Sequence, residues 1–393
     1  MDENRKYYKY TLIFLIVLSL LMYMCYKDPI ENFFILTFMF SVTKLLQFLK
    51  EKVYFSIIKS ISIFLLVYLL IFIILFINAY NISDKIEESN EKRDKTAVLM
   101  VYSGEAPRYS IDKEMRNIIL RKQKKDILIY PYRLYKTKQL YKDLGKSDYK
   151  KKSIIMYNKL ENILKDNYKL YLTYLYDDNY LENEILEILK DGYKKIIVVP
   201  MFLVEDDNMI NLQERISKLK LYNYDVETKY TETLWSSESL IQSYVNLVQI
   251  NSENMNKVGI NLIGIDKNIN NKIDNVDAIK QNIMFRSKIK EKLIQELKID
   301  SSKIKLSWYN NLDPDFISES NELFEYGISE MVCVVVDPQL NELVKIDIYN
   351  EIKDQIEFPE GVEGKVIDGF LVDNNLLNEI VSRIEYVYIQ NWN

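Results

Sequence analysis

Two long uncharged apolar stretches near the start of the chain restrict its fold more than any other feature. Residues 10–26 and 61–79 contain no charged side chain. Each stretch is close to the roughly 20 residues that a helix needs to cross a bilayer. Residues 33–48 are apolar except for Lys44, and this segment either crosses as well or lies in the membrane interface. The sequence therefore predicts a transmembrane region of about three helices over residues 1–82.

The basic residues beside these stretches predict their orientation. Arg5, Lys6 and Lys9 precede the first stretch, and Lys50 and Lys52 precede the last one. Because loops rich in Lys and Arg stay in the cytoplasm, the N-terminus and the second loop are expected there. Three spans would place the C-terminal region outside the cytoplasm, held on the cell membrane. Two spans would leave that region in the cytoplasm.

The chain of 393 residues contains no histidine, which excludes several classes of site. Catalytic triads with an imidazole, HExxH zinc sites and His-ligated haem all need this residue. The two cysteines, Cys25 and Cys333, are too few for a thiolate metal centre. None of the nine glycines is spaced as GxGxxG or GxxxxGK, so neither a dinucleotide site nor a P-loop is encoded. A net charge of −5 makes nucleic acid an unexpected partner.

Beyond a charged segment at residues 83–96, interpreted as a linker, short apolar runs alternate with helical patterns. Runs typical of buried parallel strands occur at residues 97–102, 195–200, 257–265, 303–308 and 331–336. Apolar residues recur at helical spacing at residues 179–190, 237–250, 276–297, 316–326 and 376–388. This alternation predicts an α/β fold with two Rossmann-like lobes and parallel sheets, one over residues 97–250 and one over residues 251–393.

A repeated unit supports two similar lobes. The segment EILEILKDGYKKIIVVP at residues 184–200 runs from a helix through a glycine to a strand. The segment ESNELFEYGISEMVCVVV at residues 319–336 repeats that order. Gly192 and Gly327 stand where each helix would end in a left-handed residue. We expect each glycine to cap a helix before a central strand.

Three segments resemble the class II chelatases, the family of ferrochelatase and of the cobalt and sirohydrochlorin chelatases. AVLMVYSGEAP at residues 97–107 is similar to the family's first strand and the loop that faces the tetrapyrrole. Residues 174–207 resemble its helix, glycine turn and strand that end in P-x-F-L, and QLNELVKIDI at residues 339–348 resembles the helix start with its catalytic carboxylate. The resemblance implies a two-lobed, chelatase-like protein with a porphyrin-sized cleft, in which a divalent metal ion is inserted into a tetrapyrrole.

The chain departs from the family at the positions that would carry out this chemistry. Family members use histidine with a glutamate nearby to accept pyrrole protons and to pass on the metal. The resemblance places Asp266 and Gln339 at histidine positions and Asn341 at the glutamate position. A shifted alignment would give the carboxylate role to Glu342 or Asp347 instead. Because Gln and Asn cannot take up a proton near neutral pH, metal insertion is expected to be lost or reduced.

The same resemblance implies the residues that would line the ligand site. Tyr102 ends the first predicted strand, Ser103 and Gly104 follow it, and these residues would face the tetrapyrrole. The alternative for Tyr102 is a core tyrosine at the end of the strand. Phe202 belongs to the P-x-F-L segment, and Asn208 stands where the small chelatases have a second histidine. We therefore expect these five residues to lie at the ligand.

Acidic residues are the candidates for metal binding. A single carboxylate, Asp266, at a histidine position would favour hard cations over ferrous iron or cobalt. Glu205, Asp206 and Asp207 follow a predicted strand, where parallel sheets bind ligands. In the alternative interpretation these three residues form a solvated loop that caps a helix starting near Met209.

Together these features predict a membrane-anchored, ferrochelatase-like protein that binds a tetrapyrrole or a similar flat ligand. Two alternatives stay open. One is an active divalent-metal chelatase of porphyrin or haem synthesis, and the other is a non-catalytic interaction module whose cleft is closed. No resident cofactor is assigned beyond the tetrapyrrole and the divalent metal as candidate ligands. The sequence does not define a protein partner.

Overall fold

The structure is a computed structural model that describes residues 2–27, 29–50, 57–79, 93, 95–121, 127–265, 276–309, 312–367, 369, 372 and 374–392. Asp266 and most of the predicted linker at residues 83–96 lie outside the described residues. The chain divides into two compact units. The helical unit comprises Met1–Asp84 and Arg108–Lys146, and the α/β unit comprises Lys85–Pro107 and Ser147–Asn393.

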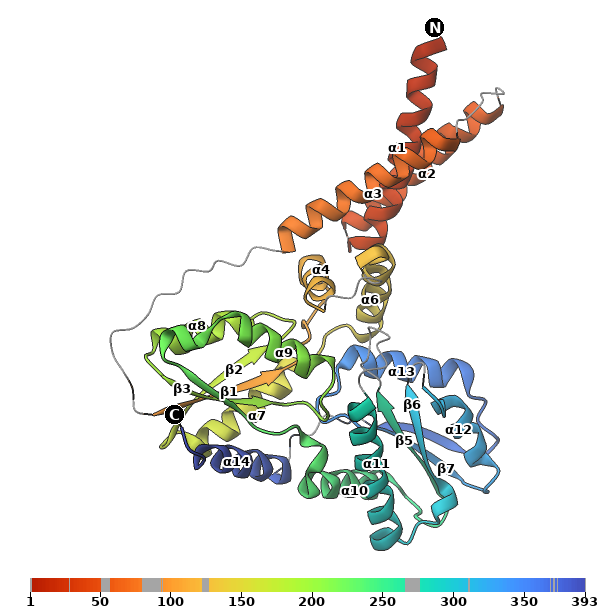
Figure 1. The fold of residues 1–393 in the computed structure, drawn as a ribbon. Helices are drawn as coiled ribbons and strands as arrows, with labels where there is room; N and C mark the ends of the chain where they lie inside the picture. Colours follow the sequence, from red (N-terminus) through yellow and green to blue (C-terminus); the bar gives the residue numbers. More distant parts are fainter. Residues whose placement is uncertain are drawn as a thin grey trace. The chain divides into compact units, whose positions relative to one another are not determined.

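The helical unit combines the N-terminal helices with a segment from later in the chain. Its helices in the described ranges are α1 (Asp2–Cys25), α2 (Ile30–Lys50), α3 (Ile57–Ala79), α4 (Ile111–Leu120) and α6 (Tyr130–Leu144). Helix α1 contacts α2, α3 and α6, while α4 contacts α3 and α6 (Figure 1). Apolar side chains from both parts, among them Val67, Met115 and Leu134, form one cluster. Residues 108–146 are thus an insertion in the α/β unit that packs on the N-terminal helices.

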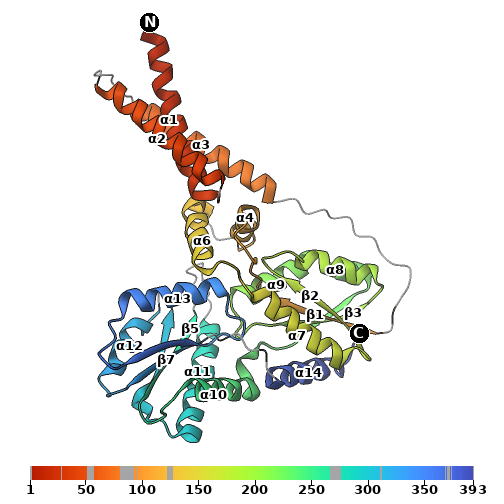
Figure 2. The same ribbon diagram turned by 180° about the vertical axis from the view of Figure 1, so that it is seen from behind.

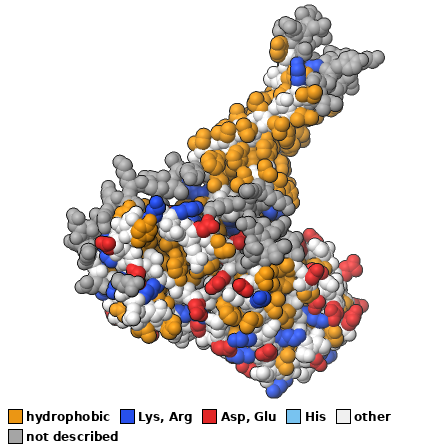
Figure 3. Space-filling model, viewed as in Figure 1, with side chains coloured by type: hydrophobic (Ala, Val, Ile, Leu, Met, Phe, Trp, Pro, Cys, Tyr) orange, Lys and Arg blue, Asp and Glu red, His pale blue; other side chains and the backbone are white. Residues whose placement is uncertain are grey.

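Two helices of this unit are long and apolar enough to cross a membrane. They are Tyr7–Cys25 within α1 and Ile58–Asn78 within α3, and protein buries only 28% and 17% of their most apolar windows. Apolar side chains cover the face of these helices that Figure 3 shows. The third predicted span is a helix, α2, but it carries Glu31 and Lys44 and does not meet the same test of length and composition.

A buried ion pair joins α2 to α6 in the helical unit. The Nζ atom of Lys138 lies 3.4 Å from Oε1 of Glu31, and their side chains are 0% and 5% exposed. Lys138 also donates to the carbonyl of Tyr26 at 3.1 Å, and the Tyr109 hydroxyl donates to the carbonyl of Cys25. Since the last carbonyls of a helix have no partner within the helix, these two side chains from the insertion satisfy the end of α1.

The α/β unit contains two four-stranded parallel sheets with the same strand order. The first sheet runs β2 (Tyr168–Tyr174), β1 (Thr96–Tyr102), β3 (Lys195–Pro200) and β4 (Glu227–Tyr230). The second runs β6 (Ile304–Tyr309), β5 (Val258–Ile265), β7 (Glu330–Val335) and β8 (Glu363–Ile367). In both sheets the chain changes direction next to its first strand, which creates a switch point between β1 and β3 and another between β5 and β7. The predicted fold of two α/β lobes with parallel sheets is confirmed.

Helices cover both faces of the sheets, as Figures 1 and 2 show. They are α7 (Tyr149–Leu164), α8 (Leu181–Lys190), α9 (Asp207–Lys218), α10 (Glu238–Asn251), α11 (Val276–Leu297), α12 (Phe316–Phe324), α13 (Glu342–Gln355) and α14 (Asn374–Tyr388). Along β7, Val332 and Val334 join the apolar cluster of α11, whereas Met331 and Cys333 join that of α12 and α13. This alternation is the period of two expected for a strand covered on both faces. The last helix, α14, contacts α7 and β3.

The two glycines of the repeated unit have the predicted conformation. Gly192 follows α8 with φ +83°, and Gly327 follows α12 with φ +65°. Each therefore ends its helix in the left-handed region, which glycine adopts without a steric cost. The strands that follow, β3 and β7, are both inner strands of their sheets.

Candidate ligand-binding site

The loops that follow β1 and β7 form the candidate site. Residues 103–107 follow β1, and residues 336–341 connect β7 to α13. Parallel α/β sheets bind ligands beyond the carboxyl ends of their strands, beside a switch point. Gly104 has φ +89°, and a Cβ atom there would lie 2.9 Å from Cβ of Tyr174. The turn after β1 therefore requires glycine at this position.

The structure brings four of the predicted site residues together across the two lobes. Nδ2 of Asn341 donates to the carbonyl of Gly104 at 3.3 Å, and the Ser103 hydroxyl lies 3.4 Å from Oδ1 of Asn341. The hydroxyl of Tyr149, at the start of α7, lies 2.9 Å from that of Ser103 and donates to Oε1 of Gln339 at 3.4 Å. Ser103 is 5% exposed and Gln339 is 2% exposed. These five residues, all buried except the half-buried Asn341, form one group, called here the interlobe polar cluster.

Glu105 is a residue of this site that the sequence reasoning missed. It lies in the turn after β1, is 4% exposed, and accepts a hydrogen bond at Oε2 from the backbone N–H of Leu343 at 3.0 Å. The pKa of Glu105 is raised to about 7; burial is the largest cause, hydrogen bonds from Ser147 and Leu343 lower the pKa, and the charge of Glu342 adds to the rise. Its position directly after Ser103 and Gly104 was the available signal. Glu105 is a carboxyl group that can exchange a proton near neutral pH.

Three buried polar atoms of the site have no hydrogen-bond partner within the described residues. They are Oη of Tyr102, Oε1 of Glu105 and Nε2 of Gln339. Tyr102 and Tyr149 pack edge to face with ring centroids 6.4 Å apart, so that Tyr102 lies beside the interlobe polar cluster. A buried polar atom without a partner costs about 1–3 kcal/mol, which a polar ligand or an ordered water would recover.

The other two predicted ligand residues have different surroundings. Phe202 is 2% exposed and belongs to the buried core. Asn208 lies in the first turn of α9, where its Nδ2 donates to Oδ2 of Asp206 at 3.1 Å. Oδ1 of Asp206 accepts from the backbone N–H groups of Asn208 at 2.9 Å and of Met209 at 3.4 Å. Asp206 therefore caps α9, as the alternative interpretation of the acidic cluster expects.

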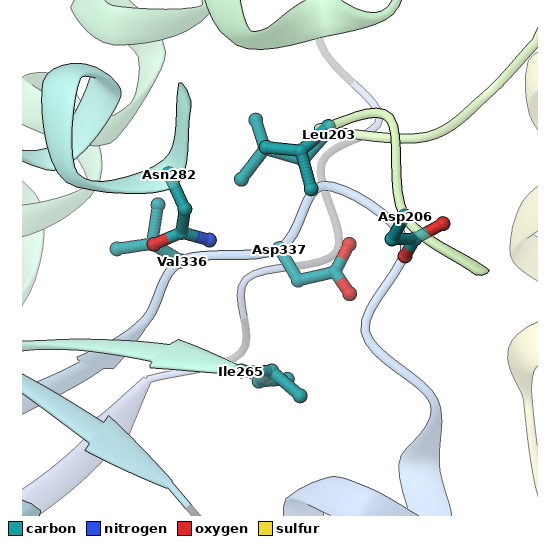
Figure 4. A pocket seen from close by; sticks show the side chains of 7 residues that line it. Leu203, Asp206, Ile265, Asn282, Val336 and Asp337 are labelled. Atoms are coloured by element: carbon teal, nitrogen blue, oxygen red, sulfur yellow. The ribbon is translucent and has the colours of Figure 1, made fainter. Parts of the chain in front are cut away.

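A small pocket lies near the interlobe polar cluster, at the ends of β3, β5 and β7. It is lined by Leu203, Val204, Asp206, Ile265, Asn282, Val336 and Asp337. In Figure 4 the side chains of Asp206, Asn282 and Asp337 approach this pocket from different segments. Asp337, which is 3% exposed, is a second site residue that the sequence reasoning missed. Asp206 belongs to the first lobe and Asp337 to the second, so the pocket brings two carboxylates from different lobes to one place.

A buried arginine supports the pocket from behind. Nε of Arg286 donates to Oδ1 of Asn282 at 2.6 Å, and its guanidinium carbon lies 4.2 Å from the ring centroid of Trp308. Burial lowers the pKa of Arg286 to about 9. Because Oδ1 of Asn282 accepts from this arginine, the nitrogen of that amide is the atom left to face the pocket.

The side chains described at this site carry oxygen and amide donors. No group of three or more Cys, Asp or Glu side chains that could hold a metal ion occurs in the described part of the chain. The site offers hydroxyl, amide and carboxylate oxygens, which suit hard cations. Cys333 is fully buried, and burial raises the pKa of its thiol to about 12, so it stays protonated.

Solved structures of other proteins share the fold of the α/β unit. The two parallel sheets and their helices form a chelatase-like fold. A structure of SirB from Bacillus subtilis with Fe3+ superposes with a TM-score of 0.50 at 14% identity, covering 75% of this chain and 96% of that chain. A structure described as the sirohydrochlorin chelatase SirB from Bacillus subtilis subspecies spizizenii in complex with cobalt gives a TM-score of 0.45 at 13% identity, covering 74% and 94%. No protein-family model and no curated protein matches this sequence.

Proposed function

We propose that this chain is a membrane-anchored, ferrochelatase-like protein that binds a tetrapyrrole or a similar flat ligand between its lobes, with metal insertion lost or reduced. One observation carries the proposal: Tyr102, Glu105 and Gln339, at the carboxyl ends of β1 and β7, each leave a buried polar atom without a partner among the residues that the structure describes. These atoms include both a donor and an acceptor. A ligand with N–H donors and carboxylate acceptors, as a metal-free tetrapyrrole has, would satisfy both kinds.

The side chains at the proposed catalytic positions support the loss of metal insertion. Insertion removes the protons of pyrrole nitrogens, which requires a base beside the macrocycle. Gln339 and Asn341 supply amides, which bind and orient a ligand but do not accept protons at neutral pH. Asp266 is assigned only by the resemblance. Glu105 is a titratable group that approaches Asn341 and Leu343.

Absorption titration of the full chain in detergent tests the binding. Metal-free porphyrins with different numbers of carboxylates, and sirohydrochlorin, are added, and we expect a saturable shift of the main absorption band. The substitution Gln339→Leu should weaken binding about tenfold, because it removes one polar contact to the ligand. The matched control is Gln295→Leu on the exposed face of α11, which should leave the affinity unchanged. The absence of any saturable shift with every macrocycle would contradict the proposal.

A closed interaction module is the second candidate, and a specific observation favours it. The interlobe polar cluster joins the two loops by direct hydrogen bonds, and Lys152 of α7 lies 2.6 Å from Glu342 of α13. If the titration detects no binding of macrocycles, this closed site favours the interaction module. The remaining alternative, an active chelatase, depends on whether Glu105 can replace the missing bases, and an assay of zinc insertion separates it from a binding protein.

The proposed location is the cell membrane. The two apolar helices within α1 and α3 support membrane association by length and composition. If α2 also crosses, the α/β unit lies outside the cytoplasm, as the basic residues near the first and last stretches favour.

A further inference from the structure

Glu105 caps a helix of the lobe to which it does not belong. Helix α13 begins at Glu342, and the side chain of its N-cap residue, Asn341, makes no capping hydrogen bond. Asn341 instead bonds to the turn after β1. The backbone N–H of Leu343, in the first turn of α13, donates to Oε2 of Glu105 at 3.0 Å. A free N–H group in a first helical turn needs an acceptor, and here the other lobe supplies it.

The short segment 339–343 carries several contacts of this kind. Gln339 accepts from Tyr149, Asn341 bonds to Ser103 and Gly104, Glu342 pairs with Lys152, and Leu343 bonds to Glu105. Four of its five positions therefore contact the first lobe. We call this segment the strap. Release of the strap would remove all of these contacts together.

Burial and a neighbouring negative charge favour the neutral form of Glu105 when the strap is closed. Burial is the largest cause of the raised pKa of about 7, and Glu342 on α13 adds to it. Glu342 is itself paired with Lys152 at 2.6 Å and with Lys345 at 3.9 Å. From α7, Tyr149 faces the same region, and the pKa of its hydroxyl is raised chiefly by burial and in smaller part by the charges of Asp337, from the loop after β7, and of Glu105.

We propose that Glu105 is the positioning residue of a proton-coupled latch, which takes up a proton when the strap closes the two lobes and releases it when they open. A neutral Glu105 can still accept from Leu343 through its carbonyl oxygen, and burying it costs less than burying a carboxylate. The sign follows from linkage. The closed form has the higher pKa, so closure is favoured at low pH and is lost as pH rises through about 7. The latch does not depend on any ligand.

The distance between the lobes in the full chain, measured in detergent without ligand, tests the latch. Spin labels are placed on cysteines introduced at the exposed residues Lys151 of α7 and Lys353 of α13. The native Cys25 and Cys333 are buried, and the chain without introduced cysteines controls for their labelling. From pH 5.5 to about 7 the short-distance population should fall, with the ratio of open to closed rising about tenfold per pH unit. From there to pH 8.5 the ratio should level off, because Glu105 is then ionised in both forms.

Variants decide whether Glu105 is responsible. Glu105→Gln keeps the acceptor and the shape but cannot titrate, so its distance distribution should stay short at every pH. The matched control is Glu184→Gln on α8, because burial also raises the pKa of Glu184 to about 7 but this residue lies in the first lobe away from the strap. That variant should respond to pH as the parent does. Glu342→Gln should move the transition to lower pH, because it removes a neighbouring negative charge.

Three results would overturn the latch. One is a parent chain whose distances do not change with pH, and another is a Glu105→Gln variant that still responds. The third is a Glu342→Gln variant whose transition stays at the same pH or moves to higher pH. This measurement decides the question even if Glu105→Gln does not fold. Failure of ligand binding would leave all three measurements unaffected.

Discussion

Gln339 and Asn341 hold the loop after β7 to the first lobe through their side-chain amides. Both side chains hydrogen-bond across the lobes, to Tyr149 and to Gly104 respectively. An amide holds such contacts at any pH, whereas an imidazole or a carboxylate would gain or lose charge there. These two side chains therefore hold the loop by hydrogen bonds and do not transfer protons near neutral pH.

Introducing a histidine and a glutamate at the two proposed base positions tests this interpretation. We expect the parent chain to insert zinc into a metal-free porphyrin at a negligible rate. The double substitution Gln339→His and Asn341→Glu should raise that rate about 10²-fold, the lower range for a positioned general base, if the cleft admits the macrocycle. Loss of the free-base porphyrin fluorescence measures the rate.

The absence of histidine from the chain makes a clean control available. Gln295→His on the exposed face of α11 introduces an imidazole far from the proposed base positions and should not raise the rate. Rapid insertion by the parent chain that survives Asp266→Ala would show that the site has been assigned to the wrong residues.

Secondary-structure elements were predictable where burial alone determines their pattern. The run at residues 331–336 reads as a buried strand because both of its faces are covered, and β7 lies at Glu330–Val335. The membership of α4 and α6 in the helical unit was not predictable. Their apolar residues, such as Met115 and Leu134, pack on partners about 40 to 120 positions away, and no local pattern records such a partner. Glu105 was missed for the same reason, since Leu343 is 238 positions away.

The contact between α6 and α2 gives a prediction at this scale. Lys138→Met keeps the length of the side chain but leaves the buried Glu31 without its buried partner. We expect the helical unit to lose about 3 kcal/mol, because the buried Glu31 carboxylate would keep only the partly exposed Lys142 as its charge partner. Hydrogen exchange of α6 in the full chain, in detergent, measures the loss.

Two further variants separate charge from packing. Lys142 lies 3.2 Å from the same carboxylate, but its side chain is 37% exposed, so Lys142→Met should cost much less. Combining Lys138→Met with Glu31→Gln should recover part of the loss, because the buried charge is gone. Equal losses for the Lys138 and Lys142 variants would contradict the assigned role of burial.

The whole molecule joins apolar helices to an α/β unit. If the apolar helices cross the membrane as proposed, crossing by α2 as well decides on which side that unit lies. With three spans, protease added to intact cells should remove the α/β unit. The basic residues before the first and last apolar stretches support this outcome. Immunodetection of the C-terminal region measures it, with a cytoplasmic protein as the control for intact cells. Complete protection until the cells are lysed would instead assign two spans and a cytoplasmic α/β unit.

The chain leaves the α/β unit for the insertion and returns to it at almost the same point. The backbone N–H of Ser147 donates to the carbonyl of Pro107 at 3.0 Å, so the two ends of residues 108–146 are held together on the α/β side. The insertion therefore leaves and re-enters the α/β unit at two residues that are hydrogen-bonded to each other. A short linker from Pro107 to Ser147 could replace it without moving either neighbour. The N-terminal helices and the insertion belong to one compact unit, so they can be removed or replaced together. The same α/β unit could then be joined to a different helical unit or expressed without one.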